Sequence, residues 1–154
     1  LCHYVLGLTI GAAAAGGWIA VTGSFAPTAY ALWAGVGLWI AGFDILYATQ
    51  DYTFDRAHGV KSIPARFGIP QALRVARASH LLAWLAFLWA GVSYGAGPLY
   101  YLGLLLVGGL LLLEHRLVSP EDLSKVEVAF FQANVGVSLG MFLFIVLDLL
   151  ARGA

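Results

Sequence analysis

The residues best suited to chemistry lie in one polar stretch, 44–68, of an otherwise apolar chain. Three aspartates, Asp44, Asp51 and Asp55, follow directly on an uncharged run that ends at Phe43. Carboxylates this close together repel one another, and the penalty grows near lipid, so we expect a bound cation to offset it. Carboxylate oxygens are the ligands that hard ions prefer, which favours Mg²⁺ or Ca²⁺ over zinc or copper.

The same stretch carries bases that could meet a phosphate. Magnesium usually keeps several waters and combines one or two carboxylates with phosphate oxygens of a substrate. Asp51 and Asp55, in an Asp-x-x-x-Asp pair, would hold the metal, and Lys61 and Arg66 would contact the remaining oxygens. The block therefore predicts a magnesium–diphosphate site. The alternative is a solvated linker in which Asp51 or Asp55 pairs with Arg56 or Lys61.

Spacing gives the three aspartates a common direction only under one condition. Separations of seven and four residues, at about 100° per residue, leave them within roughly 40° of one face if a single helix carries all three. Tyr47 lies near the same stripe. Gly59 and Pro64 make a helix through the whole block unfavourable. Of the histidines, His58 is expected to be an exposed loop residue.

The remaining histidines fall near the ends of apolar runs. We expect these three to lie at the membrane interface: His3, His80 and His115.

The composition of the chain indicates that this polar block belongs to a membrane protein. The 154 residues are 61% hydrophobic and 10% charged, with a mean hydropathy of +0.87, whereas soluble domains carry about 25% charged residues. The chain is therefore expected to be an integral membrane protein whose partner is the lipid bilayer. A formal net charge of zero offers no electrostatic footprint for nucleic acid, so no nucleic-acid partner is expected. The single cysteine, Cys2, excludes an internal disulfide.

The expected fold is all-α, a polytopic transmembrane helix bundle forming one domain over residues 1–154. A span needs about 20 mainly apolar residues. The uncharged run 81–113 would measure about 50 Å as one helix, beyond a hydrocarbon core of about 30 Å, so it must fold back near 95–98. Five spans are expected: 4–22, 28–43, 78–95, 98–115 and 127–149.

Positive charges set the expected orientation. Five of the eight lysines and arginines lie between the second and third spans: Arg56, Lys61, Arg66, Arg74 and Arg77. The positive-inside rule places that loop, and with it the polar block, in the cytoplasm. The C-terminus would then lie outside.

The motif in residues 42–68 closely resembles the second aspartate-rich motif of the UbiA superfamily of membrane prenyltransferases, particularly its 4-hydroxybenzoate polyprenyltransferase branch. The match covers the order D-x-x-Y-x-x-x-D-x-x-x-D, then Gly59, Lys61-Ser62 and the closing P-A-R-F-G at 64–68. The opening H-x-x-L-G, the loop at 114–123 and the last span also resemble this family, so the resemblance extends over essentially the whole chain.

This resemblance implies a nine-helix bundle in which two aspartate-rich motifs hold Mg²⁺ on the diphosphate of a polyprenyl donor. Loss of diphosphate leaves an allylic carbocation that alkylates an electron-rich aromatic acid. Carried over by position, Asp51 and Asp55 would be magnesium ligands, and Asp44 would be an additional acid near the metal or acceptor. The substrate-binding residues would be Tyr47, Lys61 and Arg66. Aromatic side chains such as Trp39, Phe43 or Phe131 would keep the carbocation from water.

The chain departs from the family pattern in having no N-D-x-x-D first motif and only five expected spans. We expect it to be the C-terminal half of such an enzyme, in the cytoplasmic membrane of a bacterium, acting in ubiquinone or menaquinone biosynthesis and inactive alone. An alternative is a non-catalytic membrane subunit or remnant that needs a separate N-terminal half. A cation transporter is disfavoured because its acids should lie near the middle of the spans.

Overall fold

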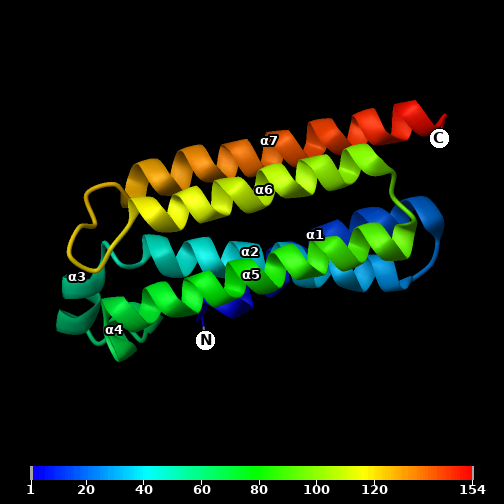
Figure 1. The fold of residues 1–154 in the computed structure, drawn as a ribbon. Coiled ribbons are helices and arrows are strands. Elements are labelled where there is room, and N and C mark those ends of the chain that lie inside the picture. Colours follow the sequence, from blue (N-terminus) through cyan, green and yellow to red (C-terminus); the bar gives the residue numbers. More distant parts are fainter. Residues whose placement is uncertain (1, 154) are drawn as a thin grey trace.

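A computed structural model describes residues 2–153, which form seven helices and no strand (Figure 1). The helices are α1 (Cys2–Thr22), α2 (Pro27–Tyr47), α3 (Tyr52–Ala57), α4 (Ile63–Phe67), α5 (Ile69–Tyr94), α6 (Pro98–Leu117) and α7 (Val126–Arg152). Five of them, α1, α2, α5, α6 and α7, are long and apolar enough to cross a membrane. The all-α fold with five spans is confirmed.

The third span is longer than expected. The prediction placed it at 78–95, but α5 begins at Ile69, so Arg74 and Arg77 lie on the helix and not in the loop. Pro70 occupies the first turn, where a missing backbone N–H leaves no helical hydrogen bond unmade. The second span is also longer, since α2 continues to Tyr47 and includes Asp44 in its last turn.

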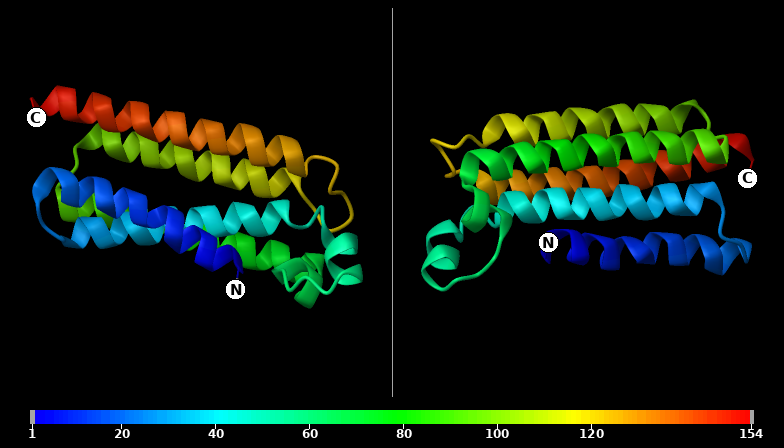
Figure 2. Two further views of the ribbon diagram at one scale, coloured as in Figure 1. Left: turned by 180° about the vertical axis from the view of Figure 1, so that it is seen from behind. Right: turned by 90° about the horizontal axis from the view of Figure 1, so that it is seen from below.

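Successive long helices run in opposite directions, so the connections gather at two ends (Figures 1 and 2). One end, called here the charged end, holds residues 48–68 with α3 and α4, and the α6–α7 connection 118–125. The opposite end holds the tight turns 23–26 and 95–97, which carry no charged residue. Gly23 and Gly95 have φ of 68° and 71°, a left-handed conformation that glycine adopts without strain.

Helices α1 and α2 approach closely enough for backbone contact. A Cβ atom on Gly7 would lie 2.1 Å from the Gly37 carbonyl oxygen, and one on Gly11 would lie 2.7 Å from that of Trp33. Small residues that allow such contact are the usual means of helix association in membranes, where lipid competes with any larger apolar side chain. This contact fixes where the start of α1 lies against the end of α2.

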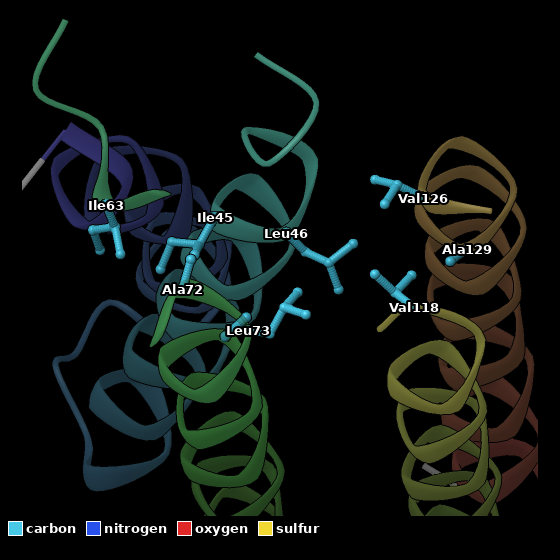
Figure 3. Close-up of a cluster of buried hydrophobic side chains, with 9 residues drawn as sticks. Ile45, Leu46, Ile63, Ala72, Leu73, Val118, Val126 and Ala129 are labelled. Carbon is cyan, nitrogen blue, oxygen red and sulfur yellow. The ribbon is translucent and has the colours of Figure 1, made fainter. Parts of the chain in front are cut away.

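A hydrophobic cluster underlies the charged end and joins segments distant in sequence (Figure 3). It contains Ile45, Leu46, Ile63, Ala72, Leu73, Ala76, Val118, Val126 and Ala129. In Figure 3, Leu46 points across toward Val118 and Val126, which belong to the α6–α7 side of the bundle. Ile63 inserts from α4. The polar block therefore rests on a packed base contributed by α2, α4, α5 and the start of α7.

Candidate active site

The backbone of the polar block turns back on itself beyond α2. Helix α2 stops at Tyr47, a turn covers residues 48–51, and α3 follows from Tyr52 to Ala57. The single helix that would have aligned all three aspartates is therefore not formed. Asp51 and Asp55 do remain one helical turn apart, because the Asp55 backbone N–H donates to the Asp51 carbonyl at 2.8 Å.

Asp55 is buried and held by a serine. The Ser62 hydroxyl donates to Asp55 Oδ2 at 2.6 Å and accepts from the backbone N–H of Ala65 at 3.3 Å. Ser62 thereby caps the N-terminus of α4, a position that serine favours. Gly59, with φ of 70°, makes the reversal that brings Ser62 back to Asp55.

A cleft of about 420 Å³ opens beside this carboxylate. Its charged lining residues are Asp55, Arg56, Lys61 and Arg66. Lys61 and Arg66 are exposed, and within residues 2–153 neither of them forms an ion pair with a carboxylate. Arg56 instead donates to the Tyr52 hydroxyl at 2.8 Å. The alternative of a self-neutralised linker therefore finds no support, and the two bases are available to an anion.

Asp44 is bound to a residue from the beginning of the chain. His3 Nδ1 lies 2.6 Å from Asp44 Oδ2, and His3 Nε2 accepts from the backbone N–H of Ile63 at 3.2 Å. Because Nε2 accepts, Nδ1 carries the hydrogen and donates to the carboxylate. Asp44 is therefore linked through His3 to Ile63, and Asp55 is hydrogen-bonded to the preceding residue, Ser62. Both residues lie between Lys61 and Arg66 in the sequence.

Two of the three histidines expected at the membrane interface are buried against other parts of the bundle. His3 is buried in the contact just described, and His80 is buried within α5 with Nδ1 at 2.9 Å from His115 Nε2. Glu114 is also buried, with Oε2 3.5 Å from His80 Nδ1. His58 is exposed, as expected. No sequence signal links His3 to Asp44, since 41 residues separate them.

An aromatic row lies along one face of α2 and ends at Tyr47, the last residue of the helix. Trp39, Phe43 and Tyr47 recur every four residues on α2 and so share a face. The Trp39 and Phe43 ring centroids are 5.7 Å apart, and Phe130 of α7 lies 5.3 Å from Phe43 and 4.6 Å from Tyr47. The sequence prediction named Phe131, which is 66% exposed, and missed Phe130. The buried stripe of α7 at 126, 129, 133 and 137 would have favoured Phe130.

The acids of the block fit magnesium better than calcium. Among the residues that the structure describes, no three His, Cys, Asp or Glu side chains gather as a metal cluster. Calcium takes six to eight oxygens, whereas magnesium needs one or two carboxylates with waters and phosphate. Asp55 makes its side-chain hydrogen bond at Oδ2, and the exposed Asp51 caps no helix amide, so each carboxylate keeps at least one oxygen without a hydrogen bond.

Two further aspartates outside the block have structural surroundings. Asp148 is buried in α7 and accepts at Oδ2 from the backbone N–H of Gly97 at 2.8 Å and at Oδ1 from that of Tyr100 at 3.3 Å. Asp122, in the loop between α6 and α7, is fully exposed, and hydrogen bonds from Ser124 hold the pKa of its carboxyl below the usual value. Neither lines the cleft.

Comparison with known proteins agrees with this picture. A profile of the UbiA prenyltransferase family matches residues 1–145. The 4-hydroxybenzoate octaprenyltransferase of Nitrosospira multiformis is 34% identical over 122 residues, covering 76% of this chain and 40% of that protein. The protein of that name from Methylococcus capsulatus is 34% identical over 145 residues, covering 89% and 48%.

A more distant curated relative and a solved structure extend the match. The 4-hydroxybenzoate solanesyltransferase of Synechocystis sp. is 31% identical over 134 residues, covering 85% of this chain and 45% of that protein. The apo structure of a UbiA homolog from Aeropyrum pernix K1 matches with a TM-score of 0.81 and 31% identity, covering 96% of this chain and 55% of that one. The chain spans less than half the length of these three curated relatives.

Proposed function

The chain belongs to the UbiA prenyltransferase family, and on that premise we propose that it forms the C-terminal part of a magnesium-dependent enzyme. This enzyme transfers a polyprenyl group from polyprenyl diphosphate to a hydroxylated aromatic acid such as 4-hydroxybenzoate. The acceptor is proposed from curated relatives that are named for 4-hydroxybenzoate. The product would enter ubiquinone or menaquinone biosynthesis.

One observation carries this proposal: a cleft combines a held carboxylate with two bases that form no ion pair within residues 2–153, in the segment that follows the aromatic row of α2. Asp55 and, one turn before it, Asp51 supply oxygens for Mg²⁺. Lys61 and Arg66 supply positive charge for diphosphate oxygens outside the metal's reach. The aromatic row on α2 supplies an apolar wall for the prenyl chain.

The proposed reaction breaks the bond between the prenyl C1 atom and a diphosphate oxygen, and the electron pair leaves with the diphosphate. Magnesium, when bound, would help to neutralise the negative charge that grows on this leaving group. Lys61 and Arg66 act on the same charge through hydrogen bonds. The faces of Phe43, Tyr47 and Phe130 exclude water and stabilise the allylic cation until an aromatic carbon bonds to C1 and the ring loses its proton.

We place the charged end in the cytoplasm of a bacterium, with the long helices in its cytoplasmic membrane. Five helices long and apolar enough to cross a membrane support the membrane setting. The positive charges at the charged end and the uncharged opposite turns support the orientation.

A second candidate is a membrane subunit that has no activity without a separate N-terminal half. This candidate is supported by the share of the relatives' length that the chain spans, which is 40–48%. In that case the remaining half of the metal site would come from a partner polypeptide.

The test is product formation in membranes that contain the complete enzyme of which this chain is proposed to be a part, supplied with a radiolabelled polyprenyl diphosphate, 4-hydroxybenzoate and Mg²⁺. Asp51→Asn should abolish prenylation, and chelation of Mg²⁺ should do the same. Asp122→Asn, a charge change at an exposed site on the same end, is the matched control and should keep full activity. Prenylation that survives Asp51→Asn at the wild-type rate would exclude the metal assignment. Activity that appears only after a first-half polypeptide is added would identify the second candidate.

A further inference from the structure

A second hollow, which we call the α5–α6 groove, lies outside the candidate active site. Its volume is about 830 Å³, and its lining comes from α5 and α6 alone. The groove-lining residues Leu81, Leu105 and Leu112 are 60%, 64% and 65% exposed. Other faces of the same helices pack inward: Ala76 and Ala83 of α5 are buried in the core, and Gly103 of α6 contacts Phe144 of α7. The groove therefore opens away from the core that the described helices share.

The groove is polar at one end and apolar along the rest. Its two cations, Arg77 and Arg116, lie toward the charged end, beside His115. From there Leu112, Gly109 and Leu105 recur along one face of α6 and give about 10 Å of apolar wall, at 1.5 Å per residue. A groove with one charged end and one apolar wall suits an amphiphilic ligand.

The charge at the polar end selects the kind of amphiphile. Within residues 2–153 neither Arg77 nor Arg116 forms a salt bridge; Arg77 makes only a long contact of 3.5 Å with the His115 carbonyl oxygen. The nearby acid Glu114 is buried toward His80 and does not line the groove. Guanidinium groups match the geometry of phosphate oxygens, and basic pockets between membrane helices at the cytoplasmic side suit anionic lipid headgroups.

We propose that the α5–α6 groove binds one anionic phospholipid of the surrounding bilayer. Its phosphate lies on Arg77 and Arg116, and one acyl chain lies along Leu105 and Leu112. The site is separate from the diphosphate cleft, which is lined by residues 55–66. It therefore does not depend on the proposed transfer reaction.

The headgroup half of the proposal is tested by native mass spectrometry of the detergent-purified chain with added phosphatidylglycerol or phosphatidylcholine. The wild-type chain should retain one phosphatidylglycerol, in preference to phosphatidylcholine by about tenfold or more. The double variant Arg77→Gln, Arg116→Gln should lose that preference. Arg74→Gln is the matched control, because Arg74 is exposed on α5 one turn away and does not line the groove. Circular dichroism checks that each variant remains helical.

The acyl-chain half is tested with a variant that fills the groove. A Cβ atom on the groove-lining Gly109 meets no atom within 4 Å, so Gly109→Leu adds a side chain that begins in open space. It should reduce bound phosphatidylglycerol about tenfold or more. Gly16→Leu is the control, since Gly16 of α1 is equally open and lies on another helix.

Three results would overturn the proposal. They are equal retention of phosphatidylglycerol by the wild type and both groove variants, equal binding of the two lipids by the wild type, and a dimer whose mass shifts to monomer in Gly109→Leu. The last would show that a second copy of the chain, and not a lipid, occupies the groove.

Discussion

The two ends of this bundle each bury an aspartate, and the two carboxylates are used differently. At the end opposite the charged end, both oxygens of Asp148 accept backbone N–H groups at the start of α6, and Arg152 lies 3.4 Å from Oδ2. At the charged end, Asp55 accepts from Ser62 and faces a cleft with Lys61 and Arg66. Asp148 joins two helices, whereas Asp55 is held by Ser62 at Oδ2 and lines an open cleft.

The difference teaches how to separate a structural carboxylate from a functional one in a membrane protein. Both are costly to bury, so each must be compensated. Asp148 is compensated within the fold, by helix amides whose positive ends it faces. Asp55 has one neutral donor, and Lys61 and Arg66, which form no ion pair within residues 2–153, line the same cleft, so we propose that a ligand completes its surroundings. Variants at the two ends should therefore fail in different assays.

The largest expected effect is on transfer activity at the charged end. Asp55→Asn should lower prenylation more than about 100-fold, because losing a metal ligand costs more than losing the outer-shell partner of one. Asp148→Asn should leave the rate per folded molecule unchanged. Initial rates normalised to folded protein measure both. Equal losses in the two variants would remove the distinction between the ends.

Substitution of His3 tests whether activity requires the link that this residue makes between Asp44 and Ile63. We expect His3→Ala to lower transfer by about 10- to 100-fold, because Asp44 and the start of α4 lose their common partner. His3→Gln, which offers both a donor and an acceptor, should recover part of the rate. A rise in KM for the diphosphate would locate the defect at residues 61–66. His58→Ala is the control at the same end, and an equal loss there would argue against a specific role for His3.

The close contact between α1 and α2 positions His3 beside Asp44. Adding one methyl group at this contact should lower the stability of the protein. Gly7→Ala places a Cβ against the Gly37 carbonyl and should cost about 1–3 kcal/mol of stability. Gly16→Ala, on the open side of the same helix, should cost nothing measurable. Thermal unfolding in detergent micelles compares the pair. If both variants melt at the wild-type temperature, α1 is not fixed by this contact.

The smallest effect is expected at the end opposite the charged end. Asp148→Ala removes the acceptors for the first amides of α6 and should lower the Tm by about 2–8 °C. The rate per folded molecule should not change. A loss of activity without a shift in Tm would show that Asp148 has a functional role instead.

Much of the fold could be predicted because membrane helices leave a direct record in sequence. Residues 81–113 contain no charge, and their length alone forces the break at residues 95–97. Boundaries at the charged end were harder to predict. Helix α5 begins nine residues before its expected start. The charges of Arg74 and Arg77 did not end the helix, because long basic side chains reach the surface from a helix as readily as from a loop.

The candidate site was predicted only within its own segment. Asp55, Lys61 and Arg66 lie close together in sequence, and the structure places them around one cleft. His3 and Phe130 were missed because each arrives from a distant helix. Their contacts depend on how α1 and α7 pack against α2, which no local spacing records.

The sequence by itself determined that this is a five-span helical protein of the UbiA family with an acid–base block at one membrane surface. Hydrophobic length and the order of charged residues are sufficient for the spans and the block, and the motif at residues 42–68 carries the resemblance to the family. Only the tertiary structure decided that His3 holds Asp44, that Ser62 holds Asp55, and that α5 and α6 leave a groove lined by Arg77 and Arg116. These features depend on side chains 7 to 41 residues apart meeting in space, and helix packing alone sets those meetings.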